Sequence, residues 1–310
     1  LIIKMKKNKS KFDQKLKRTK KLHKAIKINL KRRTIIVDDE MISFKETPIP
    51  SWIELSIIDV CNRSCTFCPK ADPKVAPNTY QKMNMILINK LAKDLKKIGY
   101  KGSVTLCGYG EPMLHKGVYE ISRKLAEVSF VEIVTNGDTL TSEIINKLYH
   151  SNVNKLLISL YDGPEQTKKF KEMTKSANVP NDFVILRDRW HDEKKDYGLK
   201  LTNRTGTINV GNQEKVGTFT YCNYPSYSVL IDWNGDVFLC PQDWQRRRTM
   251  GNIMLESFLD IWLGKTISKY RRDLLQGKRC NSPCSECNAE GTVLGNTHAE
   301  SWRKIYNLNK

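Results

Sequence analysis

Three cysteines lie within eight residues near the start of the 310-residue chain, at Cys61, Cys65 and Cys68. Thiolates are soft ligands that suit zinc and iron–sulfur clusters. A structural zinc site would take a fourth ligand from nearby, whereas His115, the next histidine along the chain, lies 47 residues beyond Cys68. Three thiolates instead leave one iron of a four-iron, four-sulfur cluster open. The spacing therefore favours such a cluster over zinc.

The chain holds six further cysteines, and five of them fall in its last third. No stretch has the pattern of a signal peptide or a membrane span, so the expected location is the cytoplasm. Reducing thiol pools keep cytoplasmic cysteines free, which argues against disulfides and for metal binding. The later cysteines are Cys222, Cys240, Cys280, Cys284 and Cys287, and only Cys107 stands alone.

The net charge of +20 is concentrated in an N-terminal arm. Residues 1–36 carry 15 Lys and Arg against Asp13, a surplus of +14 that leaves about +6 for the rest of the chain. Such an arm could contact nucleic acid, an anionic membrane surface or an acidic partner. The simpler interpretation is a solvated, partly helical tail. No strand or metal ligand is expected within residues 1–40, so their deletion should leave the metal sites intact.

From Trp52 onward, short apolar runs alternate with helical patterns, which predicts repeated βα units around a parallel sheet. The carboxyl-terminal loops of parallel strands carry the active site in such folds. The expected strands are Ile53–Asp59, Ser103–Cys107, Phe130–Thr135, Lys155–Leu160 and Asp182–Arg187. The expected helices are Asn84–Ile98, Val118–Glu127, Ser142–His150 and Glu165–Lys175.

The pattern changes after Arg187. Residues 188–217 are polar and irregular, typical of a linker or of loops that contact substrate. Two short strands, Tyr227–Asp232 and Asp236–Cys240, then flank an Asn-Gly turn that predicts a hairpin. Helices are expected at Ser257–Leu263 and Ile267–Leu275. We therefore expect an arm over residues 1–48, a core over 49–215 and a small α/β domain over 216–310.

The first cysteine cluster resembles the signature of the radical S-adenosylmethionine (SAM) superfamily, with Phe67 at the aromatic position before the last cysteine. The resemblance implies a partial (β/α)6 TIM-like barrel that carries the cluster at its mouth. It further implies that the open iron binds SAM, which one electron cleaves to methionine and a 5′-deoxyadenosyl radical. That radical abstracts hydrogen from substrate, and flavodoxin or ferredoxin is the implied type of electron donor.

Further residues sit where this family holds SAM. The loop after the second strand looks like the family's glycine-glutamate-proline motif, which implies contacts to the SAM amino group, although a plain loop is the alternative. Asn136 and Ser159 close the third and fourth strands and can point polar atoms at ribose or carboxylate. The motif residues are Gly108, Gly110, Glu111 and Pro112.

Two residues have open alternatives. Arg187 ends the fifth expected strand, where a guanidinium could pair with the SAM carboxylate. It could equally pair with Asp188 or Glu193, and Arg189 is an equally basic neighbour. Cys107 lies beside the presumed SAM site, where a thiol could return hydrogen to a substrate radical, but a small core residue is the simpler interpretation.

The later cysteines resemble the C-terminal iron–sulfur domain of radical SAM enzymes called SPASM or, in its shorter form, twitch. Gly235 and the sequence around Cys240 support the resemblance. One auxiliary four-iron cluster is expected, which makes two clusters in all. Cys280 is the spare cysteine, and a ligand set that uses Cys280 with Cys284 or Cys287 is the alternative. The expected ligands are Cys222, Cys240, Cys284 and Cys287. A zinc ribbon on the same four residues is the alternative.

The resemblance to twitch-bearing dehydrogenases favours hydrogen abstraction from a polar, carbohydrate-like molecule, by dehydrogenation or epimerisation. Radical modification of a peptide or protein side chain is the alternative enzyme function. A zinc-stabilised nucleic-acid-binding protein would explain the basic arm but would leave the Gly-Glu-Pro loop without a role.

Replacing Cys61, Cys65 and Cys68 together by alanine should remove one of two clusters. Iron analysis of the anaerobically reconstituted protein should fall from about eight to about four irons per chain, because the auxiliary thiolates remain. SAM cleavage should be lost as well. Formation of 5′-deoxyadenosine by the triple variant would show that the site is assigned to the wrong cysteines.

Overall fold

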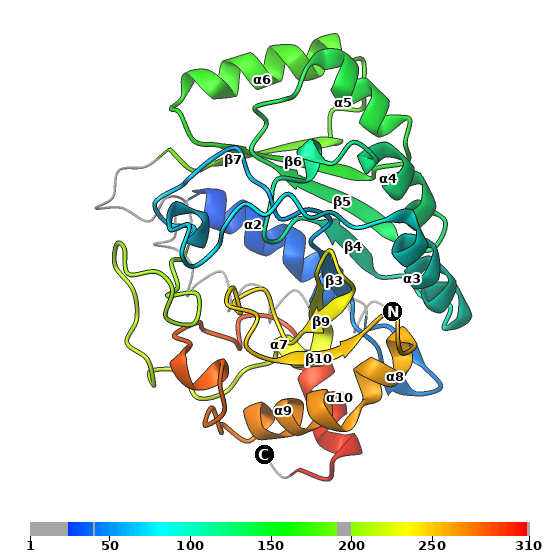
Figure 1. The fold of residues 1–310 in the computed structure, drawn as a ribbon, viewed down its shortest axis with the longest axis vertical. Coiled ribbons are helices and arrows are strands. Elements are labelled where there is room, and N and C mark those ends of the chain that lie inside the picture. Colours follow the sequence, from blue (N-terminus) through cyan, green and yellow to red (C-terminus); the bar gives the residue numbers. More distant parts are fainter. Residues whose placement is uncertain (1–23, 40, 191–199, 309–310) are drawn as a thin grey trace, which may run out of the picture.

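The computed structural model describes residues 24–39, 41–190 and 200–308. Its main sheet has eight strands in the order β10-β9-β8-β3-β4-β5-β6-β7 (Figure 1). Strands β3 to β7 and β8 are parallel, whereas β9 and β10 continue the sheet antiparallel. The parallel strands are β3 (Trp52–Leu55), β4 (Ser103–Leu106), β5 (Phe130–Thr135), β6 (Lys155–Leu160), β7 (Val184–Asp188) and β8 (Ser228–Ile231).

A helix follows each of the strands β3 to β6, as the periodicity predicts. These helices are α3 (Met85–Lys97), α4 (Val118–Ala126), α5 (Ser142–Tyr149) and α6 (Glu165–Ser176). Asn84 and Thr141 begin α3 and α5 by accepting backbone hydrogen bonds of 2.9 and 3.2 Å, which satisfies donors that a helix start leaves unpaired. The α/β fold is confirmed. The sixth parallel strand, β8, pairs with β3 and not with β7.

Strand β3 is shorter than expected. The prediction carried it to Asp59, but the segment after Leu55 leaves the main sheet. Its backbone pairs instead with the segment before α3, through the bonds Met83 N to Ile57 O (2.8 Å) and Asp59 N to Gln81 O (3.1 Å). This early departure brings the first cysteine loop over the end of the sheet.

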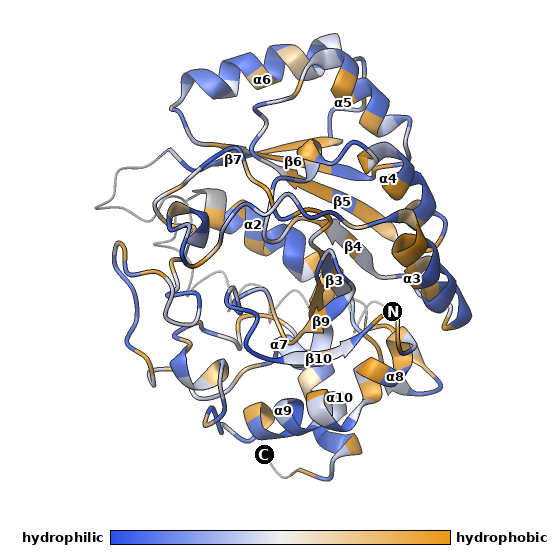
Figure 2. Ribbon diagram, in the orientation of Figure 1, coloured by the Kyte–Doolittle hydropathy of each residue, from blue (hydrophilic) through white to orange (hydrophobic). Residues whose placement is uncertain are grey.

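The two faces of the parallel sheet differ in chemistry. Side chains such as Ile53, Leu106 and Ile133 point toward the helices and form one core with Leu91 and Leu125. Hydrophobic colour accordingly follows the strands and the inward sides of α4 and α5, while the outer side of α6 is polar (Figure 2). Alternate residues along each strand face the other way, and there Glu54, Thr105 and Glu132 lie among apolar residues such as Trp52 and Leu157.

The C-terminal half continues the same sheet. The Asn-Gly hairpin forms as predicted, with Gly235 at φ +89° between β8 and β9 (Asp236–Phe238). Helices α8 (Phe258–Leu263) and α9 (Lys265–Leu275) also agree with the expectation, whereas three elements were not expected. These are α7 (Tyr224–Tyr227), β10 (Thr249–Asn252) and α10 (Asn296–Ile305). The boundary expected at residue 216 therefore divides one continuous sheet.

The packing of these C-terminal helices centres on Arg271 of α9, which is fully buried. Its guanidinium lies 4.2 Å from the ring of Trp262 in α8 and 4.0 Å from that of Trp302 in α10. It also donates to the carbonyls of Pro225 (2.7 Å) and Trp262 (3.1 Å). A single cation thus connects four helices, and burial lowers its pKa to about 10.

The N-terminal arm differs from the expectation. Residues 1–23 lie outside the described part of the chain, but helix α2 (Lys24–Thr34), a π turn (Ile35–Asp39) and a two-strand ribbon of β1 (Ser43–Phe44) and β2 (Thr47–Pro48) precede β3. Ile26 is 7% exposed and Val37 is fully buried. The expectation of a solvated tail is therefore wrong for residues 24–39, where Ile26 is buried and Val37 packs against Trp52 of the sheet. None of the described helices could cross a membrane.

Arg271→Ala should destabilise the C-terminal half. The substitution leaves a cavity between two tryptophans and buried carbonyls without donors, so we expect a loss of roughly 3 kcal/mol or more. Thermal unfolding measures the effect. Arg272→Ala is the matched control, because Arg272 is an exposed neighbour, and equal losses in both variants would contradict a special role for Arg271.

Candidate active site

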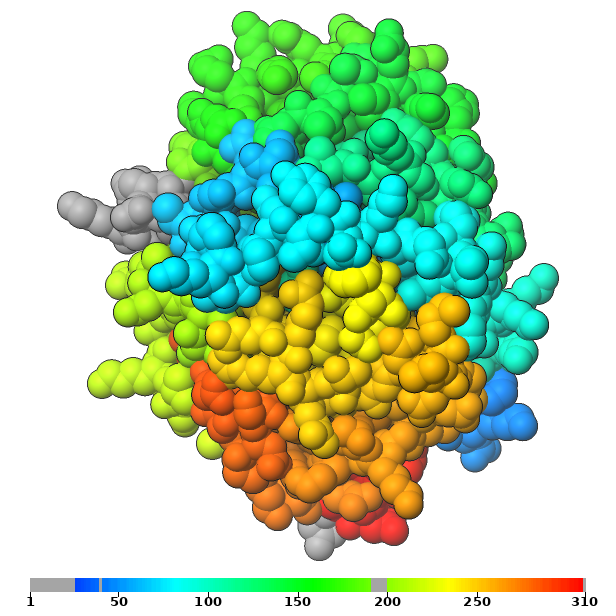
Figure 3. All heavy atoms as spheres, in the orientation of Figure 1, coloured from blue at the N-terminus to red at the C-terminus, as the bar shows by residue number. Residues whose placement is uncertain are grey.

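The first cysteine loop crosses the carboxyl end of the parallel strands. In the space-filling view, the cyan segment after β3 lies between the green βα half and the yellow-to-red C-terminal half (Figure 3). Cys61, Cys65 and Cys68 are partly buried within this loop. The Cys68 backbone donates to the Cys65 carbonyl at 2.8 Å. Asn78 holds Cys61 from both sides, by accepting from its amide and donating to its carbonyl, each at 3.1 Å.

Arg63, inside this loop, connects it to the ends of two strands. Its guanidinium donates to both oxygens of Asp138, which follows β5, at 2.6 and 2.7 Å. It donates equally to Asp162, which follows β6, at 2.6 and 2.7 Å. Planar bidentate pairs of this kind fix orientation as well as distance. The two carboxylates raise the pKa of Arg63, and the cysteine loop is held in one position over the sheet.

Electrostatics indicate that the three thiols lie close together. The pKa of Cys65 is raised to about 12, mainly by burial and also by the neighbouring Cys68 and Cys61. Burial is also the main reason why the pKa values of Cys61 and Cys68 are raised. Desolvated thiolates that repel one another need a cationic partner. Three converging thiols are the donor set that a four-iron cluster with one open iron requires.

The Gly-Glu-Pro loop packs directly against this cysteine loop. A Cβ on Gly110 would lie 2.2 Å from the Ile58 carbonyl oxygen, so only glycine allows the two backbones to approach. Glu111 is 4% exposed, and its carboxylate accepts from Thr135 Oγ1 (2.7 Å) and the Asn136 amide (2.8 Å). Burial raises the Glu111 pKa to about 7. The Glu111 carboxylate thus connects the loop after β4 to the loop after β5. Backbone atoms of the Gly-Glu-Pro loop are left to contact SAM.

The other expected SAM residues surround the same end of the sheet. Asn136 Nδ2 donates to Asn62 Oδ1 in the cysteine loop at 2.7 Å. Phe67 stacks on Tyr161 with ring centroids 6.0 Å apart. Arg187 Nη2 donates to Ser159 Oγ at 2.8 Å. These positions agree with a site formed by the ends of β4 to β7.

Arg187 is the most unusual of these residues. It is 8% exposed, and its Nε has no hydrogen-bond partner in the described part of the chain. Burial and the nearby Arg189 lower its pKa to about 9. The expected alternative, a salt bridge from Arg187 to Asp188, is not among the ion pairs of the described residues, and Glu193 lies outside them. A buried cation with an unused donor indicates an anionic or polar ligand.

Cys107 lies on the inner face of the sheet. Its sulfur is 3.4 Å from Glu54 Oε2, and burial raises the thiol pKa well above the ordinary value. Thr105 of β4 lies on the same face, because side chains alternate along the chain. The position is compatible with either interpretation of Cys107, a hydrogen donor or a core residue.

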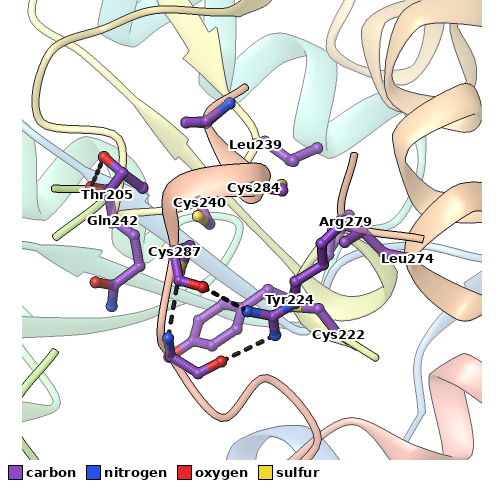
Figure 4. Close-up of a pocket in the computed structure, with 13 residues that line it drawn as sticks. Thr205, Cys222, Tyr224, Leu239, Cys240, Gln242, Leu274, Arg279, Cys284 and Cys287 are labelled. Carbon is purple, nitrogen blue, oxygen red and sulfur yellow. Dashed lines mark hydrogen bonds between the residues drawn. The ribbon is translucent and has the colours of Figure 1, made fainter. Parts of the chain in front are cut away.

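The four expected auxiliary ligands line one cavity (Figure 4). Burial raises the pKa of Cys284, and the nearby thiols of Cys222 and Cys287 raise it further. Burial also raises the pKa of Cys240, and the other three thiols raise it further. Cys280, in contrast, is exposed and does not line the cavity. Its role as a spare agrees with this position.

Backbone contacts hold the auxiliary cysteines in place. Arg279 donates to the carbonyls of Cys287 (3.2 Å), Ala289 (2.9 Å) and Tyr221 (2.9 Å), and so connects the segments that carry Cys287 and Cys222. The Ala289 amide also points at the Cys287 sulfur at 3.4 Å. Such N–H contacts stabilise a thiolate.

A turn that the sequence analysis missed completes the auxiliary cavity. Arg204, Thr205 and Gly206 all have positive φ angles, of 46°, 55° and 87°. Asn203 anchors this turn to the Cys287 segment by donating to Glu286 O at 2.7 Å. Thr205 anchors it to the Cys240 segment by donating to Gln242 O at 3.1 Å. Only Gly206 hinted at this turn, because non-glycine residues rarely adopt such angles.

The residues present suit the two kinds of iron–sulfur site. Three thiolates beside the Gly-Glu-Pro loop leave room for SAM, and four thiolates around one cavity complete a closed cluster. Among the described residues, no group of three or more His, Cys, Asp or Glu is arranged to hold a single metal ion. Fold and site together define a radical SAM enzyme with an auxiliary cluster domain.

Comparison with known families agrees. Residues 55–190 match the radical SAM superfamily, and residues 222–288 match SPASM, an iron–sulfur cluster-binding domain. The chain therefore belongs to the radical SAM superfamily and carries a C-terminal SPASM-type domain. It is an oxidoreductase-type enzyme whose cofactors are SAM and iron–sulfur clusters. This result replaces the alternative of a zinc-stabilised nucleic-acid-binding protein.

Individual relatives resemble the chain over different lengths. The S-adenosyl-L-methionine-dependent 2-deoxy-scyllo-inosamine dehydrogenase of Niallia circulans is 27% identical over 243 residues, which cover 77% of this chain and 92% of that protein. The GTP 3′,8-cyclase of Clostridium perfringens is 28% identical over 131 residues, 41% of this chain and 39% of that enzyme. The crystal structure of BtrN in complex with AdoMet and 2-DOIA shares the fold, with a TM-score of 0.67, 23% identity and coverage of 82% of this chain and 98% of that chain.

Arg63→Ala should loosen the cysteine loop, because it removes four hydrogen bonds to Asp138 and Asp162. We expect the reconstituted variant to lose iron from the first site several-fold faster than wild type, measured by the decay of cluster absorbance on exposure to a chelator. Lys74→Ala serves as control, since Lys74 is an exposed cation in a neighbouring loop. Unchanged iron retention in Arg63→Ala would show that the pairing does not hold the loop.

Proposed function

We propose that the enzyme dehydrogenates a small, polyhydroxylated, carbohydrate-like molecule. The observation that carries this proposal is the closed auxiliary site, in which Cys222, Cys240, Cys284 and Cys287 surround one cavity. Four thiolates occupy every corner of a four-iron cluster, so no iron remains to bind substrate. A closed cluster can accept an electron, which is what a dehydrogenation requires. The likeness to the 2-deoxy-scyllo-inosamine dehydrogenase over nearly its whole length supports the substrate class.

When bound, SAM and the first cluster supply one-electron cleavage and a radical that removes a hydrogen atom from carbon. The protein's own residues position the loops and the donor groups around the ligand. Gly110 lets the backbone of the Gly-Glu-Pro loop approach the cysteine loop. Glu111 holds the Gly-Glu-Pro loop to the end of β5. Arg187 offers its unused Nε to the ligand, while Ser159 holds the guanidinium in place.

The proposed reaction balances as a two-electron oxidation of an alcohol. The substrate carbon gives one hydrogen atom to the radical, and its hydroxyl then gives one proton to a base and one electron to the auxiliary cluster. A carbonyl forms, so the product is two mass units lighter than the substrate. Each turnover consumes one SAM, because the abstracted hydrogen leaves in 5′-deoxyadenosine.

The proposal includes a partner and a location. Reduction of the first cluster needs a one-electron donor, for which flavodoxin or ferredoxin is suitable, and free thiols suit the cytoplasm. Contact between the basic arm and a polyanion stays a separate proposal, because most of the arm's charge lies outside the described residues.

Cys284→Ala should block product formation while leaving some SAM cleavage, because the first cluster has its own ligands. Small-molecule and peptide pools from cells with and without the active protein, compared by mass spectrometry, should contain a small polar product two mass units below its precursor. Cys280→Ala is the control and should behave as wild type, since that thiol is exposed and outside the cavity. A product of unchanged mass, which gains one deuterium on carbon when the reaction is run in heavy water, would indicate epimerisation instead. A modified peptide would contradict the substrate class.

A further inference from the structure

A row of polar side chains runs across the inner face of the parallel sheet, opposite the face that packs on helices. The strand register places Glu54 of β3 beside Thr105 of β4, and Thr105 beside Glu132 of β5. Thr105 and Glu132 are fully buried, and Glu54 is 8% exposed. Cys107 and Arg187 lie on the same face, nearer the SAM site. Charged groups are rarely buried without a partner, so this face must be covered by polar groups.

Helix α2 provides this cover. Arg32 donates to Glu132 Oε2 in an ion pair with side chains 10% and 1% exposed. Arg33 lies 3.9 Å above the ring of Trp52 in β3 and donates to Tyr224 in α7 at 3.4 Å. The helix also contacts β7, and Figure 1 shows it between β7 and the C-terminal half. It therefore crosses the open side of the partial barrel.

The chain after α2 anchors the helix in this position. Val37 is fully buried and packs with Trp52, Tyr227 and Leu294. Asp38 accepts a hydrogen bond from the Gly295 amide at 2.7 Å, at the start of α10. Residues from both halves of the molecule thus hold α2, although it precedes both of the matched family ranges.

Several buried polar atoms on this inner side have no hydrogen-bond partner among the described residues. They include Glu132 Oε1, Arg32 Nε, Trp52 Nε1 and Arg187 Nε. Native proteins leave few such groups unpaired. Three of the four are donors and one is an acceptor. A polyol can satisfy both kinds, since each hydroxyl both donates and accepts.

We propose that α2 forms the inner wall of the substrate chamber and that Arg32, held by Glu132, is a specificity-determining residue for hydroxyl groups of the substrate. The chemistry of the ligand rests on the proposed function, whereas the position of the wall does not. The N-terminal segment, outside both family matches, would then adapt this chain to its own substrate.

The wall is tested without substrate, through the thiol of Cys107 on the inner face. The clusters are first reconstituted, and alkylation by iodoacetamide is followed by peptide mass spectrometry. Arg32→Ala should speed alkylation of Cys107 about fivefold or more by opening the wall. Loss of the Arg32 cation by itself would raise the thiol pKa and slow the reaction, so acceleration reports access. The exposed Cys280 is the internal reference.

Lys31→Ala is the matched control, because Lys31 is an exposed cation on the same helix. It should change neither the alkylation rate nor the iron content. No acceleration in Arg32→Ala, or equal acceleration in both variants, would overturn the wall. Loss of the clusters in Arg32→Ala would also overturn the proposal, because Arg32 would then be needed for the fold alone.

The specificity role is tested with the molecule that the mass comparison identifies. Arg32→Ala should raise KM about tenfold with little change in kcat, as expected when a bond to a charged group is lost. A fall in kcat at unchanged KM would overturn this role. If Cys107 becomes accessible in Arg32→Ala but no lighter product is found, the wall is supported and the proposed dehydrogenation fails, so the two failures remain distinguishable.

Discussion

The central constraint in this molecule is the double pairing of β3. This strand pairs in parallel with β4 on one side and β8 on the other, so that Trp52 lies opposite both Ser103 and Ser228. One strand therefore belongs to the βα repeat and to the cluster-bearing C-terminal half. The first cysteine loop leaves its carboxyl end, and the chain around β8 and β9 carries Cys222 and Cys240. Because one sheet holds both sites, their relative position follows from strand pairing and not from a flexible linker.

The two metal sites are held by different means. The first depends on charge-assisted hydrogen bonds, with Arg63 between Asp138 and Asp162, and on the close backbone contact at Gly110. The second depends on backbone contacts of segments that meet from far apart in the chain, through Arg279 and the Asn203 turn. The first loop leaves room for an open iron and a neighbouring cofactor, and Asn78 also holds it at Cys61. At the second site, Cys222, Cys240, Cys284 and Cys287 line one cavity from different segments of the chain.

The inner face of the sheet is the least ordinary part of the structure. A closed barrel fills its interior with side chains from its own strands, but here six parallel strands leave one side open. Helix α2 fills that side with Arg32 and Arg33, and Glu54 and Glu132 supply the opposing charge. A mostly apolar filling would have stabilised the fold at lower cost in desolvation. The polar filling is therefore better explained by the chemistry that takes place beside it than by stability.

Local pattern was enough to predict much of this protein. The spacing of Cys61, Cys65 and Cys68, the βα periodicity and the Asn-Gly hairpin each depend on neighbours in sequence, and strands β5 and β6 have the expected bounds. Tertiary structure decided the rest. Arg63 was missed because its partners lie 75 and 99 residues away, and the Asn203 turn because its positive φ angles are imposed by distant anchors. The basic sequence of α2 resembled a solvated tail, because the groups that balance its charges are far away in sequence. Only folding brings Glu132 and the aromatic rings next to it. Composition records charge, whereas burial and pairing depend on which surfaces meet.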